Sequence, residues 1–543
     1  MPRPVRAVGL LTCAALGAAA LAPRLGAQAS PPAAPARMSP STLPRLATID
    51  RRFQSYNVEM AEVTGGNFWK PYTPESVAQL TEKARQASSA GPTAFGGQVG
   101  QDTTLFQAMP PLDLTNPRLR RMAAALGPAY VRVSGSWANQ IYFHDADTPA
   151  PQKAPAGFDG VLTRAQWRGV VDFARAADAR LMTSFAIGRG VRDSAGTWTP
   201  VEARKLLRYT NALGGQITDA EFFNEPDMPE YGGAPKGYDA AQYARDHAAF
   251  VRWARAEAPG MRVVGPSSVG EGTLMQDMAG KMPGFLSTTA MFAATPRPEV
   301  DVFSYHHYPA ASIRCGMYSG PETALSEEFL ARTDREYDFY VTGVRDRMLP
   351  GRPPVWITET ADAACGGNPW GATFLDTFRY TDQMGRLARR GVNVIFHNTL
   401  AASEYALLDP KTFAPRPNFW AALLWRRLMG PTVLDAGVPM RAGLHVYAHC
   451  LPGRPGGVTL LAINTSRTEA ASLDLAAAAE RYTLSAPELQ GGTALLNGQA
   501  LALGANDALP ALRGAPVAAG PVALAPTTIT YLTVAGAGNA ACR

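Results

Sequence analysis

Cysteine and histidine are scarce in this sequence, and their spacing argues against the common metal sites. The 543 residues include five cysteines and seven histidines. The cysteines lack the close paired spacing of a structural zinc site. His306 and His307 are neighbours in a predicted strand, where successive side chains point to opposite faces and cannot easily share one ion. We therefore expect no bound metal.

The sequence also lacks a strongly charged segment and a nucleotide-binding motif. It has 51 Lys and Arg residues against 45 Asp and Glu residues, for a formal net charge of +6. The cations are scattered, and no nucleic-acid-binding motif accompanies them. No Gly-x-Gly-x-x-Gly follows a candidate strand, which disfavours a dinucleotide cofactor. We therefore expect neither a nucleic-acid partner nor a cofactor.

The N-terminus has the features of an export signal. Residues 1–29 begin with two arginines in the first six positions and continue with an apolar run and a small-residue cleavage site, which predicts a signal peptide. Residues 30–44 are rich in Pro and Ala and predict a flexible tether. No later segment is apolar enough for a membrane span, so we expect an exported protein, periplasmic or extracellular, without a membrane anchor. The even number of cysteines beyond the signal agrees with an oxidising compartment and allows three pairings: Cys315, Cys365, Cys450 and Cys542.

Between residues 45 and 429, short apolar runs alternate with longer amphipathic segments. Eight runs predict strands, at 54–59, 129–134, 179–185, 220–225, 261–266, 300–308, 354–359 and 392–398. Eight strands, each followed by helical material, are typical of a (β/α)8 TIM barrel, an α/β fold. From residue 430 to 543, short alternating runs separated by Gly, Pro and Asn predict a C-terminal β-sandwich domain. We expect the first residues of the 45–429 segment to join this sandwich.

Two of the predicted barrel strands end in a glutamate. Glu225 ends the fourth strand and Glu359 the seventh, on facing sides of a closed barrel. Barrel enzymes carry their chemistry at the C-terminal ends of the strands, so both carboxylates are predicted to project into one mouth. Glycoside hydrolysis needs such a pair, one group protonating the leaving oxygen and the other attacking the anomeric carbon. Arg132, inside the second strand, needs a buried partner, and a glutamate of this site is the expected one.

These residues resemble the retaining barrel glycosidases, and in detail glycoside hydrolase family 79, the heparanase and β-glucuronidase group. The resemblance covers most of residues 45–543. It is carried by Asn224-Glu225-Pro226, by Glu359, and by the segments 116–135, 304–309, 355–369, 444–464 and 539–543. It implies an enzyme that hydrolyses β-glucuronosyl linkages in oligosaccharides, glycoconjugates or glycosaminoglycans through a covalent intermediate.

The resemblance also implies a role for each site residue. Glu225 would be the general acid/base and Glu359 the nucleophile. Contacts to the sugar would come from Asn224, Glu59 and Tyr308, and the uronic acid carboxylate would be bound by Gly366, Gly367 and Tyr405. The resemblance implies a bridge between Cys450 and Cys542, which leaves Cys315 and Cys365 as the second pair.

Three other functions compete with removal of terminal glucuronate. The first is endo-cleavage of heparan sulfate, as in heparanase. The segment 67–116 lacks a long basic linker, since its only cations are Lys70, Lys83 and Arg85, so sulfate-binding clusters do not carry over. The second is a related enzyme for a neutral sugar. The third is a non-catalytic polysaccharide-binding protein, against which the presence of both glutamates argues.

Overall fold

The computed structural model describes residues 37–89, 103–274, 276 and 284–543. The chain divides into two units, Met1–Pro35 and Ala36–Arg543, and the described residues belong to the second. The predicted signal peptide and residues 30–36 of the predicted tether lie outside the described residues. Within the described ranges, no helix combines the length and the apolar character that crossing a membrane requires.

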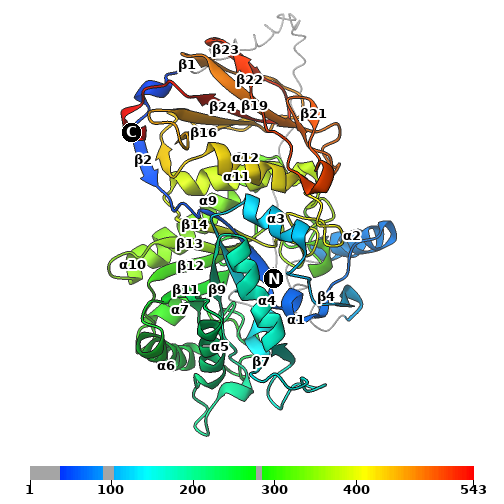
Figure 1. Cartoon of the computed structure of the whole chain (residues 1–543), viewed down its shortest axis with the longest axis vertical. Helices are drawn as coiled ribbons and strands as arrows, with labels where there is room; N and C mark the ends of the chain where they lie inside the picture. The colour runs from blue at the N-terminus through cyan, green and yellow to red at the C-terminus, as the bar shows by residue number, and fades with distance from the viewer. Residues whose placement is uncertain (1–36, 90–102, 275, 277–283) are drawn as a thin grey trace, which may run out of the picture. The chain divides into compact units, whose positions relative to one another are not determined.

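Eight parallel strands close into a barrel (Figure 1), which confirms the predicted fold class. In chain order they are β3 (Gln54–Glu59), β6 (Ala129–Ser134), β9 (Ala179–Thr183), β10 (Ile217–Glu221), β11 (Arg262–Val269), β12 (Val302–His307), β13 (Val355–Thr360) and β14 (Val394–His397). Each strand pairs with its neighbours along the chain, and β14 pairs with β3 to close the barrel.

Helices surround the barrel (Figure 1). They are α1 (Met60–Thr64), α2 (Pro74–Ser89), α3 (Pro117–Ala125), α4 (Arg164–Ala176), α5 (Val201–Ala212), α6 (Ala240–Glu257), α7 (Thr288–Ala293), α8 (Glu327–Leu330), α9 (Arg332–Tyr337), α10 (Asp346–Met348), α11 (Phe374–Arg389) and α12 (Pro417–Leu428). Thr163 and Gln166 form a reciprocal capping box at the start of α4, and Asp239 and Gln242 do so at the start of α6. These pairs satisfy amide groups that a helix leaves without partners at its first turn.

The barrel interior is apolar near the strand starts and polar near the strand ends. A layer of seven buried side chains fills the first part: Tyr130, Met182, Val264, Val302, Trp356, Val394 and Phe396. Arg132 follows Tyr130 by two residues on β6, so it points into the same lumen one layer further along. The buried polar groups therefore gather at the C-terminal end of the barrel, where the two predicted glutamates also lie.

Beyond the barrel, two sheets share one core and form a sandwich. The larger sheet contains β2 (Arg45–Thr48), β15 (Thr432–Leu434), β16 (Leu444–Cys450), β17 (Val458–Asn464), β19 (Ala479–Ser485), β20 (Leu495–Leu496), β21 (Gln499–Ala500), β22 (Ala515–Val517) and β24 (Thr528–Val534). The smaller contains β1 (Arg37–Met38), β18 (Ala471–Leu475) and β23 (Gly520–Leu524). Leu473 of the smaller sheet is buried in the same cluster as Leu460 and Leu532 of the larger one.

Helices α11 and α12 lie between the barrel strands and the larger sheet (Figure 1). Leu424 of α12 belongs to the same buried cluster as Tyr447 of β16 and Leu461 of β17. The buried Arg386 of α11 and His445 of β16 both contact Asp382, at 2.7 and 2.6 Å. Apolar burial and buried ion pairs therefore both join the barrel to the sheets.

The structure differs from the sequence-based expectation at two places. Residues 37–44, expected as part of a tether, contribute strand β1 and a short 3-10 helix at Pro40–Thr42, because Met38 is buried against the small sheet. The fourth barrel strand runs over Ile217–Glu221 rather than 220–225. Glu225 is therefore not the last residue of a strand but lies in the loop that follows it.

Candidate active site

Irregular pairing between β12 and β13 makes the side chain of Glu359 point into the barrel mouth. Trp356 faces the interior, so strict alternation along β13 would point Glu359, three residues later, outward. Against β12, however, Tyr305 pairs with Ile357 and His306 pairs with Glu359, so Thr358 is an extra residue. Such a bulge reverses the alternation locally. Glu359 therefore faces the same lumen as Trp356.

Hydrogen bonds hold the loop that carries Glu225. The backbone amide of Asn224 donates to Asn139 Oδ1 at 2.9 Å, and Asn139 Nδ2 donates to the Asn224 carbonyl at 2.9 Å. Glu225 itself has a positive φ of 50°, an uncommon conformation for a residue with a side chain. These hydrogen bonds fix the backbone at Asn224, so that the side chain of Glu225, the next residue, points into the barrel mouth.

Arg132 is the central cation of the site. Its guanidinium donates to Glu221 Oε2 at 2.8 Å, to Glu359 Oε2 at 3.0 Å and to Asn224 Oδ1 at 2.7 Å. Arg132 and Glu221 are fully buried, so each needs the other to offset the loss of water. The expected pairing of Arg132 with a glutamate of the site is confirmed, and Glu221 is a second partner that the sequence reading missed.

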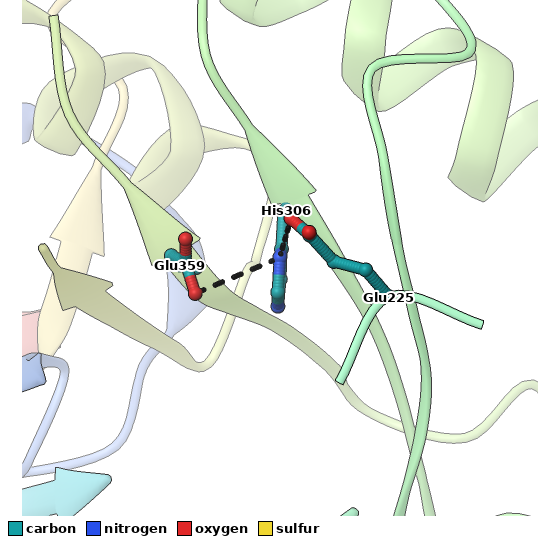
Figure 2. Close-up of side chains that lie close together, drawn as sticks. All are labelled: Glu225, His306 and Glu359. Atoms are coloured by element: carbon teal, nitrogen blue, oxygen red, sulfur yellow. Dashed lines mark hydrogen bonds and ion pairs between the residues drawn. The ribbon is translucent and has the colours of Figure 1, made fainter. Parts of the chain in front are cut away.

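The carboxylates of Glu225 and Glu359 lie next to each other, on either side of His306 (Figure 2). His306 Nδ1 is 3.0 Å from Glu225 Oε1 and 3.8 Å from Glu359 Oε2. One carboxylate oxygen of Glu225 and one of Glu359 lie within 4.8 Å of each other. The structure therefore brings together the two glutamates that the sequence singled out.

Burial separates the protonation behaviour of the groups in this cluster. Burial raises the pKa of Glu225 to about 7, although Arg132 lowers it in part. Burial alone would raise the pKa of Glu221, but Arg132 and His306 hold that pKa below its usual value. Burial also lowers the pKa of His306 to about 4, so this imidazole is neutral near pH 7. The cluster thus holds a carboxyl that is half protonated at neutral pH beside carboxylates paired with Arg132.

The donor set of this cluster also bears on metal binding. Within the described ranges, Glu225, His306 and Glu359 form the one group of three His, Cys, Asp or Glu side chains close enough to share an ion. Arg132 already neutralises Glu359 at 3.0 Å and lies 3.4 Å from His306 Nε2. A divalent cation placed among these three groups would be repelled by the guanidinium, which disfavours a metal here.

Tyr308 and Asn398 fix the other oxygen of Glu359. Tyr308 donates from its hydroxyl to Glu359 Oε1 at 2.5 Å. Asn398 Nδ2 donates to the hydroxyls of Tyr308 at 3.0 Å and Tyr405 at 3.2 Å. Both oxygens of Glu359 are thus held by donors, Oε2 by Arg132 and Oε1 by Tyr308, which orients the carboxylate in the barrel mouth.

A cavity of about 260 Å³ opens at this point. It is lined by the predicted residues Glu59, Asn224, Glu225, Tyr308, Cys315, Glu359, Cys365 and Tyr405, and by Trp69, Phe106, Gly135, Ser136, Trp137, Met228, Tyr231, Val269, Leu274, Ala364 and Asn398. Glu59 Oε2 is buried and has no hydrogen-bond partner among the described residues. Burial and the charge of Glu359 raise the pKa of Glu59 well above its usual value.

Gly366 and Gly367 are not among the residues that line the cavity, but each lies beside one that does. Both are buried and have positive φ values of 78° and 82°. A Cβ on Gly367 would lie 3.1 Å from the ring of Tyr405, and a Cβ on Gly366 would lie 2.7 Å from Trp69. Trp69 and Tyr405, which both line the cavity, therefore lie against the two glycines. A side chain at either glycine would displace one of these aromatic rings.

The four cysteines beyond residue 29 form the two expected disulfides. Cys450, at the end of β16, is bonded to Cys542, with 5.3 Å between their Cα atoms. Cys315 is bonded to Cys365, with 6.2 Å between their Cα atoms, and both line the cavity. Such bonds are typical of proteins outside the cytosol.

Four residues of the site were missing from the sequence-based prediction. Glu221 and His306 were overlooked as members, Asn398 as a donor, and Arg314 as a support of Gly366 and Gly367. Glu221 had no positional signal, since it precedes the apolar pair Phe222-Phe223 and does not end an apolar run. For Asn398 a signal existed, since it is the last residue of the predicted eighth strand, 392–398.

Comparisons with known proteins agree with this geometry. No protein-family model matches the chain. Heparanase-like protein 1 of Arabidopsis thaliana is 28% identical over 374 residues, which is 65% of this chain and 65% of that protein. Heparanase of Rattus norvegicus is 26% identical over 407 residues, or 65% of this chain and 71% of the rat protein. The chain thus matches slightly less than two thirds of the length of the Arabidopsis relative.

A solved structure shares the fold. The 4-O-α-L-rhamnosyl-β-D-glucuronidase of Fusarium oxysporum superposes with a TM-score of 0.57 at 13% identity, covering 92% of this chain and 99% of the other. At that identity the likeness concerns the arrangement of barrel and sheets. The sequence relatives, and not the fold alone, support membership of the heparanase and β-glucuronidase family of glycoside hydrolases, family 79.

Proposed function

We propose that the protein is an exported β-glucuronidase that acts by double displacement with retention of configuration. One observation carries the proposal: one carboxylate oxygen of Glu225 and one of Glu359 lie within 4.8 Å of each other. Retaining glycosidases hold their two carboxyl groups roughly 5–5.5 Å apart, whereas inverting enzymes need about 6.5–9.5 Å to admit a water molecule. The observed spacing supports the retaining mechanism.

In the first step, Glu359 would attack the anomeric carbon. The bond between this carbon and the glycosidic oxygen breaks as Glu225 donates its proton to the leaving oxygen. A pKa of about 7 keeps enough of Glu225 protonated at neutral pH for this role. Arg132 and Tyr308 orient the attacking carboxylate. The product of this step is an ester between Glu359 and the sugar.

In the second step, Glu225 reverses its role. Having lost its proton, it takes one from a water molecule as that water attacks the anomeric carbon and releases Glu359. His306 lies 3.0 Å from Glu225 and is neutral, so it supports the carboxylate without adding a charge. Two inversions at one carbon give retention.

The family's way of binding the uronic acid carboxylate is matched at Gly366, Gly367 and Tyr405. Neither glycine amide donates a hydrogen bond to any group in the described ranges. Backbone amides can bind an anion without a cationic side chain. The unpartnered Glu59 Oε2 and the side chain of Asn224 would contact hydroxyls of the same sugar. This set supports glucuronic acid over a neutral sugar.

The lining of the cavity favours exo-action on an uncharged aglycone. Its only charged members among the described residues are the glutamates at 59, 225 and 359, and no Lys or Arg is present. Trp69 stacks on Phe106, with ring centroids 4.5 Å apart, at the same wall. A sulfated polymer would find no cationic side chain among these lining residues to pair with its sulfate groups.

Endo-cleavage of heparan sulfate is the second candidate, because the match with rat heparanase supports it. The test is hydrolysis of 4-nitrophenyl β-D-glucuronide, with the β-D-glucoside as a control. Cleavage of the glucuronide alone, with β-glucuronate as the first product by NMR, supports the proposal. An α-configured first product would refute retention. Shortening of heparan sulfate chains without cleavage of the aryl glucuronide would favour the second candidate.

A further inference from the structure

The loops after β12 and β13 run side by side next to the cavity. Ala311 forms a parallel bridge with Ala364, and the Ser312 amide donates to the Ala364 carbonyl at 3.1 Å. Ser312 Oγ donates to the Cys365 carbonyl at 2.9 Å. The Cys315–Cys365 disulfide joins the same two loops covalently. The two loops therefore form one unit.

Three consecutive residues of the second loop have left-handed backbone. The φ values of Cys365, Gly366 and Gly367 are 62°, 78° and 82°. Glycine adopts this conformation readily, but cysteine does so only when its surroundings hold it. The disulfide and the hydrogen bond from Ser312 provide that restraint at Cys365.

Arg314 donates hydrogen bonds to the carbonyl groups of these three residues. Its Nη1 donates to the carbonyl oxygens of Cys365 at 3.3 Å, Gly366 at 3.0 Å and Gly367 at 3.3 Å. The Arg314 side chain is 1% exposed, and Glu404 pairs with it at 2.8 Å. Tyr72 stacks on the guanidinium at 3.7 Å and donates to the Gly367 carbonyl at 3.0 Å. The guanidinium is thus held in place on all sides.

This arrangement determines where the amide groups point. In a trans peptide unit, the carbonyl group and the N–H of the next residue point in opposite directions. Because Arg314 binds the carbonyls of Cys365 and Gly366, the amides of Gly366 and Gly367 point away from it. Tyr405, which lines the cavity, is the neighbour of Gly367. The loop therefore offers the positive ends of its peptide dipoles to an anion beside Tyr405.

We propose that Arg314 and the Cys315–Cys365 disulfide are positioning elements that determine the preference for uronic acid glycosides. Arg314 does not line the cavity, and the two cysteines line it without taking part in the chemistry at the anomeric carbon. Arg314 and the disulfide hold the 365–367 loop in a backbone conformation that presents its amides to the carboxylate at C6. The inference rests on the proposed function, because it assigns the carboxylate to this loop. Loss of Arg314 or of the disulfide should weaken the binding of the charged sugar strongly and should slow the reaction at the anomeric carbon much less.

The test compares two substrates that differ only at C6, 4-nitrophenyl β-D-glucuronide and the corresponding β-D-glucoside. The variants are Arg314→Gln, the conservative Arg314→Lys, and the double variant Cys315→Ala/Cys365→Ala. The double variant Cys450→Ala/Cys542→Ala is the matched control, since it removes a disulfide far along the chain from the loop. Circular dichroism and thermal unfolding establish that each variant is folded.

We expect Arg314→Gln and Cys315→Ala/Cys365→Ala to lower the ratio of kcat/KM, glucuronide over glucoside, by at least tenfold, mainly through KM. Arg314→Lys should recover part of the ratio, because the ammonium reaches fewer carbonyls. The Cys450→Ala/Cys542→Ala control should keep the wild-type ratio. An unchanged ratio in folded variants, or an equal loss with both substrates, would overturn the inference. A wild-type enzyme that cleaves neither substrate and forms no covalent sugar ester on Glu359 would instead overturn the proposed function.

Discussion

Arg132 Nη1 lies 3.0 Å from Glu359 Oε2, while the same guanidinium contacts Glu221 at 2.8 Å. One buried cation therefore neutralises two carboxylates from different strands. Removing one partner of a buried ion pair leaves an uncompensated charge and costs about 3–5 kcal/mol. Loss of Arg132 is therefore expected to affect both the free energy of unfolding and the proposed reaction of Glu359.

Arg132→Met should therefore lower the free energy of unfolding by about 3–5 kcal/mol. It should also reduce kcat, because Glu359 would lose the donor that orients its carboxylate. Urea unfolding followed by circular dichroism measures the first effect. Arg132→Met/Glu221→Gln is the matched control, since it removes one of the two stranded charges and should recover part of the stability. Equal stability of Arg132→Met and wild type would contradict this account of the cluster.

The activity should depend on the protonated form of Glu225. Since burial raises the pKa of Glu225 to about 7, the acid form is lost as the pH rises through 7. We expect kcat/KM for phenyl β-D-glucuronide to fall about tenfold per pH unit above that value. Glu225→Gln should lower kcat/KM by roughly 10²–10⁴-fold and remove this limb of the profile. A limb that persists unchanged in Glu225→Gln would assign the ionisation to another group.

His445 should make the junction of barrel and sheet sensitive to alkaline pH. Burial alone would lower its pKa, but Asp382 at 2.6 Å and Glu327 at 2.7 Å raise the pKa of His445 to about 9. Because the folded pKa exceeds the unfolded value of about 6.5, the stabilisation is complete below pH 6.5 and is lost as the pH rises toward 9. The loss amounts to up to about 3 kcal/mol at about 1.4 kcal/mol per pKa unit.

The measurement is the urea midpoint of unfolding between pH 6 and pH 9.5. His445→Gln should be less stable than wild type at pH 6, and the difference should narrow as the pH rises. A stability difference that stays constant over this range would show that the charge of His445 plays no part.

Gly367→Ala should damage the substrate site more than the fold. The new Cβ would lie 3.1 Å from Asp362 Oδ1 and 3.1 Å from the Tyr405 ring, at a φ of 82° that alanine rarely adopts. We expect a loss of about 1–3 kcal/mol in stability and a larger fall in kcat/KM for the glucuronide than for the glucoside. Gly196→Ala is a suitable control, because it has a similar φ of 74° and open space around its Cα. Equal effects of the two substitutions on substrate preference would contradict the role of Gly367.

The barrel and the paired glutamates were predictable because both leave periodic or positional signals in the sequence. Eight apolar runs with helical material between them predict the closed barrel, and Glu225 and Glu359 stand out at the ends of such runs. Their exact setting was not predictable. The extra residue Thr358 in β13 reverses the side-chain alternation, and such a bulge depends on pairing with the neighbouring strand.

The supporting residues were harder to foresee than the glutamates. Glu221 was overlooked because the fourth strand ends four residues earlier than expected. Arg314 was overlooked because three of its partners are backbone carbonyls, which have no residue-specific signal in a sequence. The position of Met38 in the sandwich was not predictable for a different reason, because a strand of two residues shows no alternation of apolar and polar side chains.

The most direct test of the central claim is to trap the intermediate on Glu359. The enzyme is incubated with a 2-deoxy-2-fluoro-β-D-glucuronosyl fluoride, whose sugar ester turns over slowly, and is then digested and analysed by mass spectrometry. The account predicts one added fluoroglucuronosyl group on the peptide that contains Glu359, and none on that peptide in Glu359→Gln. A label on another residue, or continued turnover of the glucuronide by folded Glu359→Gln, would contradict it.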